Sequence, residues 1–168
     1  MIRFTRALLI VALVALALPA AAQTSPGVPF VIQPAVVSAI ANGTVTRNTG
    51  TLPICNAMDV LLNITTTGTA TGTLSVYVED SPDGGVTWDD LISSNTFALG
   101  ASVITQRFFV SGYIASTATS GSAAAAETLA AGTTRQGPFG YLFRVREKMA
   151  SASGSPVGAT YTITAVCK

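Results

Sequence analysis

The sequence predicts an all-β protein, folded as a mostly antiparallel β-sandwich of the jelly-roll or Ig-like kind. Two observations support this fold class. Several runs alternate apolar with polar residues, and β-branched and aromatic residues dominate them, as is typical of half-buried strands. Turn-forming pairs such as Asn42-Gly43 and Thr67-Gly68 separate these runs, and short strands at such spacing favour a sandwich or a small barrel.

Residues 1–22 have the order of a secretory signal peptide. Arg3 and Arg6 are followed by an uncharged apolar run over residues 7–18, and then by Pro19 and three alanines. The run is much shorter than the roughly twenty residues that a membrane-spanning helix needs. We therefore expect a signal-peptide helix that is cut after Ala22, and a secreted, periplasmic or cell-surface protein with a bacterial type of signal.

Residues 23–35 contain Pro26, Pro29 and Pro34, and prolines at this density favour an extended chain. We expect a loosely held N-terminal arm there, either disordered or donated as a strand to a neighbour.

Removing 22 of the 168 residues leaves 146, which is enough for one core. Residues 36–168 are therefore expected to form a single β-sandwich domain.

Four runs show the alternation most clearly, and each predicts a strand with one buried face. Their buried positions are expected to be Met58, Val60, Leu62 and Ile64; Leu74, Val76 and Val78; Phe139, Tyr141, Phe143 and Val145; and Tyr161, Ile163, Ala165 and Cys167. Between Val103 and Ile114 both faces are apolar, which predicts a central strand and its successor.

An insertion rich in Ala, Ser, Thr and Gly interrupts this rhythm at residues 115–134. Ser122 has the properties of an N-cap for one short Ala-rich helix that would run to Ala131, and Gly132 would end it. The alternative is a loop between two strands.

The composition limits the classes of partner. Charged residues make up 10% of the chain, against about a quarter in ordinary domains. Loss of Arg3 and Arg6 with the signal leaves seven basic residues (9 − 2) against eight acids, a net charge of −1, which offers little to nucleic acid or to an anionic membrane. A surface so poor in charge repels its own copies weakly. The expected partner is a second copy of the chain, or a glycan or protein of a cell surface.

The two cysteines, Cys55 and Cys167, both lie in the exported part, where thiols oxidise by default. Two cysteines allow one internal pairing, so we expect a structural disulfide. Cys55 has the wrong parity for the inward face of the strand at 58–64, and a bend at Pro53 is needed to turn it toward Cys167. The chain contains no His, which disfavours a reactive or metal-bound thiol.

Residues 81–88, Ser-Pro-Asp-Gly-Gly-Val-Thr-Trp, form the most specific motif of the chain. A tight hairpin needs a residue with positive φ, which Gly84 or Gly85 supplies, and Ser81 and Asp83 can accept hydrogen bonds from turn amides. Trp88 is expected to fold its ring under the turn. The pattern at Ser81, Asp83, Gly85, Thr87 and Trp88 resembles the Asp-box of sialidases and other propeller proteins. There it is a structural hairpin away from the catalytic residues, so the resemblance implies a fold element.

A wider resemblance covers roughly residues 57–166. The stretch from Tyr77 to Leu91, the strand Phe143-Arg144-Val145, the turn Ser153-Gly154-Ser155-Pro156 and the strand Tyr161-Thr162-Ile163 are similar to small β-sandwich proteins of tailed phages and prophages. This resemblance implies a structural or virion-surface role. A signal peptide departs from that family, because virion proteins assemble in the cytoplasm.

Three groups of residues are candidates for binding or catalysis. Glu79, Asp80, Asp83, Asp89 and Asp90 crowd into one segment, as Ca²⁺ ligands do, but their spacing matches no EF-hand loop and a solvated hairpin is the favoured interpretation. Glu79 and Glu147 are the carboxylates available for glycoside hydrolysis. Trp88, Tyr77 and Tyr113 are candidates for stacking on a sugar, and Tyr77 is expected to point outward as the ligand contact. We expect no metal, cofactor or catalytic residue.

The sequence therefore predicts an exported, non-enzymatic structural or surface-interaction protein that assembles with its own copies and is related to phage proteins. The alternative is a secreted carbohydrate-binding or adhesive module.

Overall fold

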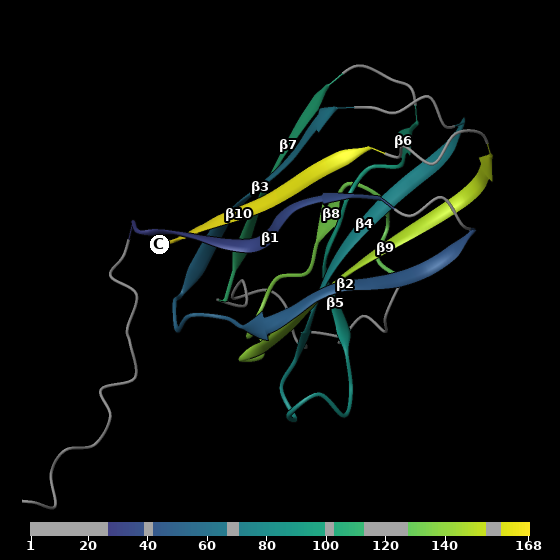
Figure 1. The fold of residues 1–168 in the computed structure, drawn as a ribbon. Helices are drawn as coiled ribbons and strands as arrows, with labels where there is room; N and C mark the ends of the chain where they lie inside the picture. The colour runs from purple at the N-terminus through teal and green to yellow at the C-terminus, as the bar shows by residue number, and fades with distance from the viewer. Residues whose placement is uncertain (1–26, 39–41, 67–70, 100–102, 113–127, 154–158) are drawn as a thin grey trace, which may run out of the picture.

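A computed structural model of the chain describes residues 27–38, 42–66, 71–99, 103–112, 128–153 and 159–168 (Figure 1). The predicted signal peptide, residues 23–26, Tyr113 and most of the insertion lie outside the described residues. Among the described residues, no helix is long and apolar enough to span a bilayer.

The described residues form two antiparallel sheets. Sheet A has the order β1 (Pro29–Val37), β10 (Thr160–Cys167), β3 (Ala57–Thr66) and β7 (Ile104–Ser111). Sheet B has the order β2 (Gly43–Thr51), β9 (Leu142–Ser153), β4 (Thr71–Ser81), β5 (Asp89–Ser93) and β8 (Thr133–Thr134), and β6 (Phe97–Ala98) also pairs with β4. The all-β class is confirmed, and two sheets of this kind are consistent with a sandwich. The choice between jelly-roll and Ig-like topology stays a prediction.

The core lies where the alternating faces predict it. Met58, Val60, Leu62 and Ile64 of β3 are buried, and so are Leu74, Val76 and Val78 of β4. Tyr161, Ile163, Ala165 and Cys167 of β10 are buried as well, alternating with partly exposed threonines at 160, 162 and 164. Side chains on one face of each strand thus meet in one hydrophobic cluster.

Two predicted strand boundaries differ from the structure. Much of the predicted arm belongs to the sheet, because β1 begins at Pro29 and pairs with β10. Pro34 lies within the register shift between Gln33 and Val36 of this edge strand, a place that tolerates a missing N–H. In the run that starts at Phe139, the strand begins only at Leu142, so Tyr141 lies outside it and is 56% exposed.

The prediction of a central strand between Val103 and Ile114 is wrong for the described residues. β7 is an edge strand of sheet A that pairs with β3. Phe108 and Val110 point into the core, whereas Phe109 is 58% exposed. The second apolar face of this run therefore faces solvent.

The described end of the insertion, residues 128–134, is a turn followed by β8, so no helix extends through it. Gly132 has a φ of 76° and reverses the chain there. The predicted helix start at Ser122 lies outside the described residues.

Side-chain hydrogen bonds reach backbone groups on β1 and β7, the two edge strands of sheet A. On one side, the Asn48 side chain of β2 donates to the Ile32 carbonyl of β1. On the other side, Gln136 accepts a hydrogen bond from the Ser111 amide at 2.9 Å and donates to the Phe109 carbonyl at 3.2 Å. These contacts occupy backbone groups that edge strands would otherwise expose.

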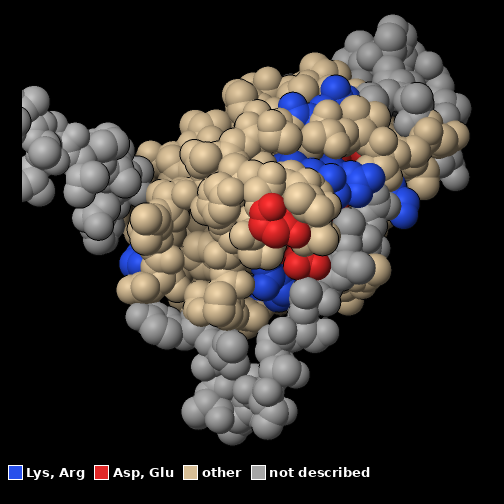
Figure 2. Space-filling model, turned by 90° about the horizontal axis from the view of Figure 1, so that it is seen from below, with Lys and Arg blue, Asp and Glu red and all other residues tan. Residues whose placement is uncertain are grey.

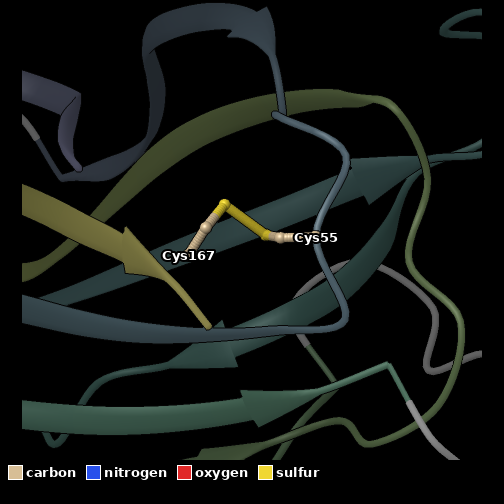
Figure 3. Close-up of a disulfide and its surroundings, with 2 residues drawn as sticks. All are labelled: Cys55 and Cys167. Carbon is tan, nitrogen blue, oxygen red and sulfur yellow. A yellow bond between two sulfur atoms is a disulfide. The ribbon is translucent and has the colours of Figure 1, made fainter. Parts of the chain in front are cut away.

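Cys55 and Cys167 are bonded in the structure, as the sequence predicts. Figure 3 shows Cys167 at the end of β10 and Cys55 on the loop before β3, with their side chains directed at one another. Their Cα atoms are 5.6 Å apart, within the normal range for a disulfide. The bond joins residues 112 apart in sequence, so it ties the start of β3 to the last strand.

Removing this bond by Cys55→Ser with Cys167→Ser should lower the free energy of unfolding by about 4 kcal/mol, because the unfolded chain gains the entropy of a long open loop. Urea unfolding with and without reductant measures the difference. Reductant should leave the double variant unaffected. An unchanged unfolding midpoint of the reduced wild type would contradict the prediction.

Candidate functional site

Four buried carboxylates lie on strands β4, β5 and β9 of sheet B. Glu79, Asp80, Asp90 and Glu147 are each at most 1% exposed. A buried charge is costly unless ion pairs and hydrogen bonds compensate it. Their partners therefore show which segments the chain must bring together.

Asp80, near the end of β4, fixes the segment that leads into β9. Its carboxylate pairs with Arg135 and accepts a hydrogen bond from the Gly140 amide. Arg135 also donates to the carbonyls of Asp90, at 3.1 Å, and Pro138, at 3.0 Å. A Cβ at residue 140 would overlap the Ser81 carbonyl, so this close approach requires glycine. Asp80 thus holds residues 135–140 against β4.

Glu79 points to the outer face of sheet B, on the opposite side of the sheet from Asp80. It pairs with Arg144 and with Arg146, whose Nη1 lies 3.3 Å from the Glu79 carboxylate. The Arg144 guanidinium also stacks on the Trp88 ring, 4.6 Å from its centroid. Both arginines lie on this face because they are two residues apart in β9.

Glu147 points the other way, into the space between the sheets. It pairs with Arg47 of β2 and accepts a hydrogen bond of 2.9 Å from the Tyr161 hydroxyl of β10. Burial, and then the adjacent Glu147 charge, raise the pKa of Tyr161 well above its ordinary value, so its hydroxyl stays protonated and donates. The hydrogen bond to Glu147 raises the pKa of Arg47. This triad joins the two sheets.

The carboxylate pair considered for glycoside hydrolysis does not assemble. Glu79 is opposite Arg144 in the β4–β9 register and Glu147 is opposite Val76, so the two carboxylates lie on opposite faces of sheet B. The acidic side chains of residues 79–90 also do not gather at one site, because Asp90 accepts hydrogen bonds from the amides of Thr128 and Leu129. In the described part of the chain, no group of three or more acidic or cysteine side chains is arranged to hold a metal.

The 81–88 turn is held by the side chains that the motif predicts. The Ser81 hydroxyl accepts from the Gly85 amide at 2.8 Å, and Asp83 accepts from the amides of Val86 and Thr87 at 3.1 and 2.9 Å. Ser81 and Thr87 also donate their hydroxyls to Asp83. The Thr87 hydrogen bonds, first the backbone one, lower the pKa of Asp83 to about 2.

The Trp88 side chain folds back against the turn. Its indole N–H donates to the Gly85 carbonyl at 3.0 Å, and a Cβ at Gly85 would lie 3.5 Å from the ring. Gly84 and Gly85 have φ values of 77° and 93°, which supply the positive φ that the hairpin needs. The geometry of the turn therefore follows from its local sequence.

Tyr77 is not the exposed ring that the sequence predicts. It lies on the face of β4 opposite Val76 and Val78, as its parity requires, but it is only 8% exposed. Trp88 is partly buried under its turn. A side chain that points outward by the alternation of the strand is still buried where other parts of the chain cover that sheet face.

Tyr141 is an exposed ring that lies beside an open hollow. Leu52, Pro53, Ile54, Cys55, Phe139, Gly140 and Tyr141 line this hollow, which has a volume of about 140 Å³. Ile54 is 77% exposed, and the Tyr141 hydroxyl lies 3.3 Å from where a Cβ of Gly84 would be. The disulfide and the 81–88 turn, the two most distinctive features of the sequence, thus flank the same hollow. We call this region the turn end.

The turn end has a mainly uncharged surface. Figure 2 views the molecule from below, the side toward which the β4–β5 turn projects in Figure 1, and charged atoms form small separate groups among uncharged residues. The hollow is not predicted from the sequence, because the alternation at residues 139–145 assigns Tyr141 to a strand. The signals that could have found it are Pro53 and Gly140, which break strand pairing on either side.

No protein-family model matches the chain, and neither a curated protein nor a solved structure matches it. The resemblance to Asp-box hairpins and to small phage β-sandwich proteins therefore stays a prediction.

The charge of Asp83 should contribute stability only above acidic pH. Because its folded pKa lies below the ordinary 3.8, the contribution is complete above about pH 5 and is lost as the pH falls toward 2. Asp83→Asn should therefore unfold at a lower temperature than wild type at pH 6, and the gap should close by about pH 2. Thermal unfolding followed by circular dichroism measures it, with Thr87→Val as an intermediate case. A gap that is independent of pH would contradict the assignment.

Tyr161→Phe should destabilise the fold by about 2 kcal/mol, because it removes the donor to one oxygen of the buried Glu147 carboxylate and leaves the pair with Arg47. Tyr141→Phe is the matched control, since it removes the hydroxyl of an exposed ring and should change stability by no more than about 0.5 kcal/mol. Urea unfolding compares the two. Equal effects would show that the triad does not hold the sheets together.

Proposed function

We propose that this protein is an exported, non-enzymatic surface-interaction module that binds an apolar segment of another protein at the turn end. The observation that carries the proposal is the open hollow between the disulfide and the 81–88 turn, with Ile54 and Tyr141 exposed at its rim. Exposed apolar groups around a concave site are the usual features of a binding surface.

The rigidity of the hollow supports a binding role. Cys55 is fixed by the disulfide, and the Leu52 amide donates to the Tyr141 carbonyl at 2.7 Å. Gly140 is held by Asp80. A preformed site loses little conformational entropy when it binds, so even a small hollow can contribute affinity.

The lining favours a protein segment over a sugar. Its side chains are aliphatic or aromatic apart from the disulfide sulfur, and the Tyr141 hydroxyl is the single polar side-chain group among them. Sugar sites orient several hydroxyls with placed polar groups, in addition to one aromatic ring. Tyr141 is nevertheless the observation that keeps a carbohydrate-binding module as the second candidate.

Two further observations support an exported, structural role. The Cys55–Cys167 bond is of a kind that persists in oxidising compartments. Glu79, Asp80 and Glu147 are engaged in ion pairs that hold strands together, which is a structural use of carboxylates. A relation to phage proteins, as the sequence suggests, would fit the same role.

Two-dimensional NMR with the oxidised chain from Gln23 tests the proposal. N-acetyl-leucinamide, titrated as a probe of apolar side chains, should shift the amide signals of residues 52–55 and 139–141 in a saturable way. Ile54→Asp should weaken the effect at least tenfold, as expected when a charge replaces an apolar contact. Thr46→Asp, on the exposed edge of sheet B, is the control and should leave it unchanged.

Methyl β-glucoside, titrated in parallel, separates the two candidates. Saturable shifts with the sugar alone, lost in Tyr141→Ala, would replace the proposal by a carbohydrate-binding module. No shift at the turn end with either probe would overturn the binding role of the hollow.

A further inference from the structure

The outer face of sheet A carries rows of mostly uncharged side chains. In the registers of its four strands, one row across the sheet is Pro29, Val166, Asp59 and Phe109, the next is Val31, Thr164, Leu61 and Arg107, and the third contains Thr162, Asn63 and Thr105. Most of these side chains are uncharged, and β-branched residues dominate on β10.

Three strands of the face, β10, β3 and β7, keep a regular register over most of their length, and the face is poor in charge. β3 and β7 pair without any shift, and β10 pairs with β3 without a shift from Tyr161 to Cys167. Register shifts occur in both sheets, in β1–β10 of sheet A and in β2–β9, β4–β5 and β4–β9 of sheet B. The outer face of sheet B also carries the stack of Trp88 on Arg144. A surface of paired strands with few charges packs well against a copy of itself.

Large apolar side chains stand exposed at both edges of this face. Val31 of β1 is 57% exposed and Phe109 of β7 is 58% exposed, and Leu61 lies partly exposed between them. An apolar surface that reaches from one edge strand to the other is a feature of association sites.

The face carries charges of both signs, so it can complement the same face of a second copy. Asp59 pairs with Arg107, whose Nε lies 2.6 Å from the Asp59 carboxylate, and Lys168 is 4.0 Å away. The Arg107 side chain is 70% exposed, so its guanidinium is available to a second carboxylate. A two-fold axis through the sheet can bring each Arg107 toward the Asp59 of the other copy, whereas a strongly charged partner would find little to complement.

The area of the face is sufficient for a weak dimer. Four strands of about eight residues, at roughly 3.3 Å per residue and 4.8 Å between strands, cover about 500 Å². Two such faces bury about 1,000 Å², the lower limit for a specific interface.

We propose that two copies of the chain associate through the outer faces of sheet A, related by a two-fold axis. The interface goes beyond the proposed function, because it lies on strands β1, β10, β3 and β7 and not at the turn end. The low charge of the chain favours self-association, and this interface assigns that self-association to a defined surface. It leaves both hollows of the dimer open to a partner.

Light scattering on a sizing column, over a concentration series of the oxidised chain from Gln23, tests this interface. The wild type should pass from monomer to dimer as concentration rises. Thr164→Glu places a charge in the centre of the face and should weaken association at least tenfold, whereas the same substitution on sheet B, Thr46→Glu, should not change it. Ile54→Asp should also dimerise like wild type, which separates this interface from the turn end.

Arg107→Glu is the second variant, because its side chain is exposed and its replacement spares the core. It should also abolish the dimer, with a urea midpoint close to wild type. A wild type that is monomeric at every concentration, or a dimer that both Thr164→Glu and Arg107→Glu leave intact, would overturn the proposal. So would equal loss of the dimer in Thr46→Glu.

Discussion

The need to pair every buried carboxylate is the constraint on which the rest of this structure depends. Glu79 and Asp80 are consecutive in β4, so their side chains leave the sheet on opposite sides. Glu79 then requires the two arginines of β9, and Asp80 requires Arg135 and the Gly140 amide. Leaving one of these charges unpaired would cost several kcal/mol, a large share of the stability of a small domain. The path of the chain between β8 and β9 follows from this requirement.

The same constraint shapes the turn end. Because Asp80 holds Gly140 close to Ser81, the next residue, Tyr141, cannot enter the core and stands beside the 81–88 turn. The disulfide fixes the opposite wall of the hollow at Cys55. A local hydrogen-bonded turn, a buried ion pair and a covalent bond therefore meet in one place. This convergence produces a rigid apolar hollow in a chain that otherwise consists of regular strands.

The two outer faces of the molecule have different chemistry. Sheet B carries the Glu79 network and the Trp88–Arg144 stack on its outer face, so its charged groups already have partners within the chain. Sheet A presents threonines, valines and Phe109 in regular rows. A module with a rigid hollow at one end and a charge-poor face along one side can bind a partner and a second copy at the same time. This arrangement is how the proposed binding and association fit in one small domain.

The sequence by itself determined the features that depend on near neighbours. The alternation in residues 58–64, 74–78 and 160–167 set their buried faces, since side chains alternate along any strand. The motif at 81–88 set its own turn, because each donor and acceptor lies within four residues of its partner. The presence of two cysteines in the expected exported part allowed one pairing, which the structure contains.

Only the tertiary structure decided what depends on distant segments. Parity placed Tyr77 on the outer face, but its burial depends on what covers that face. Glu147 interrupts an apolar pattern, and only the approach of Arg47 and Tyr161 makes its burial tolerable. β7 became an edge strand, and Tyr141 an exposed ring, through pairings and ion pairs made with residues far away in sequence. Local periodicity fixes which way a side chain points, whereas its exposure and charge partners are set by segments that only the folded chain brings together.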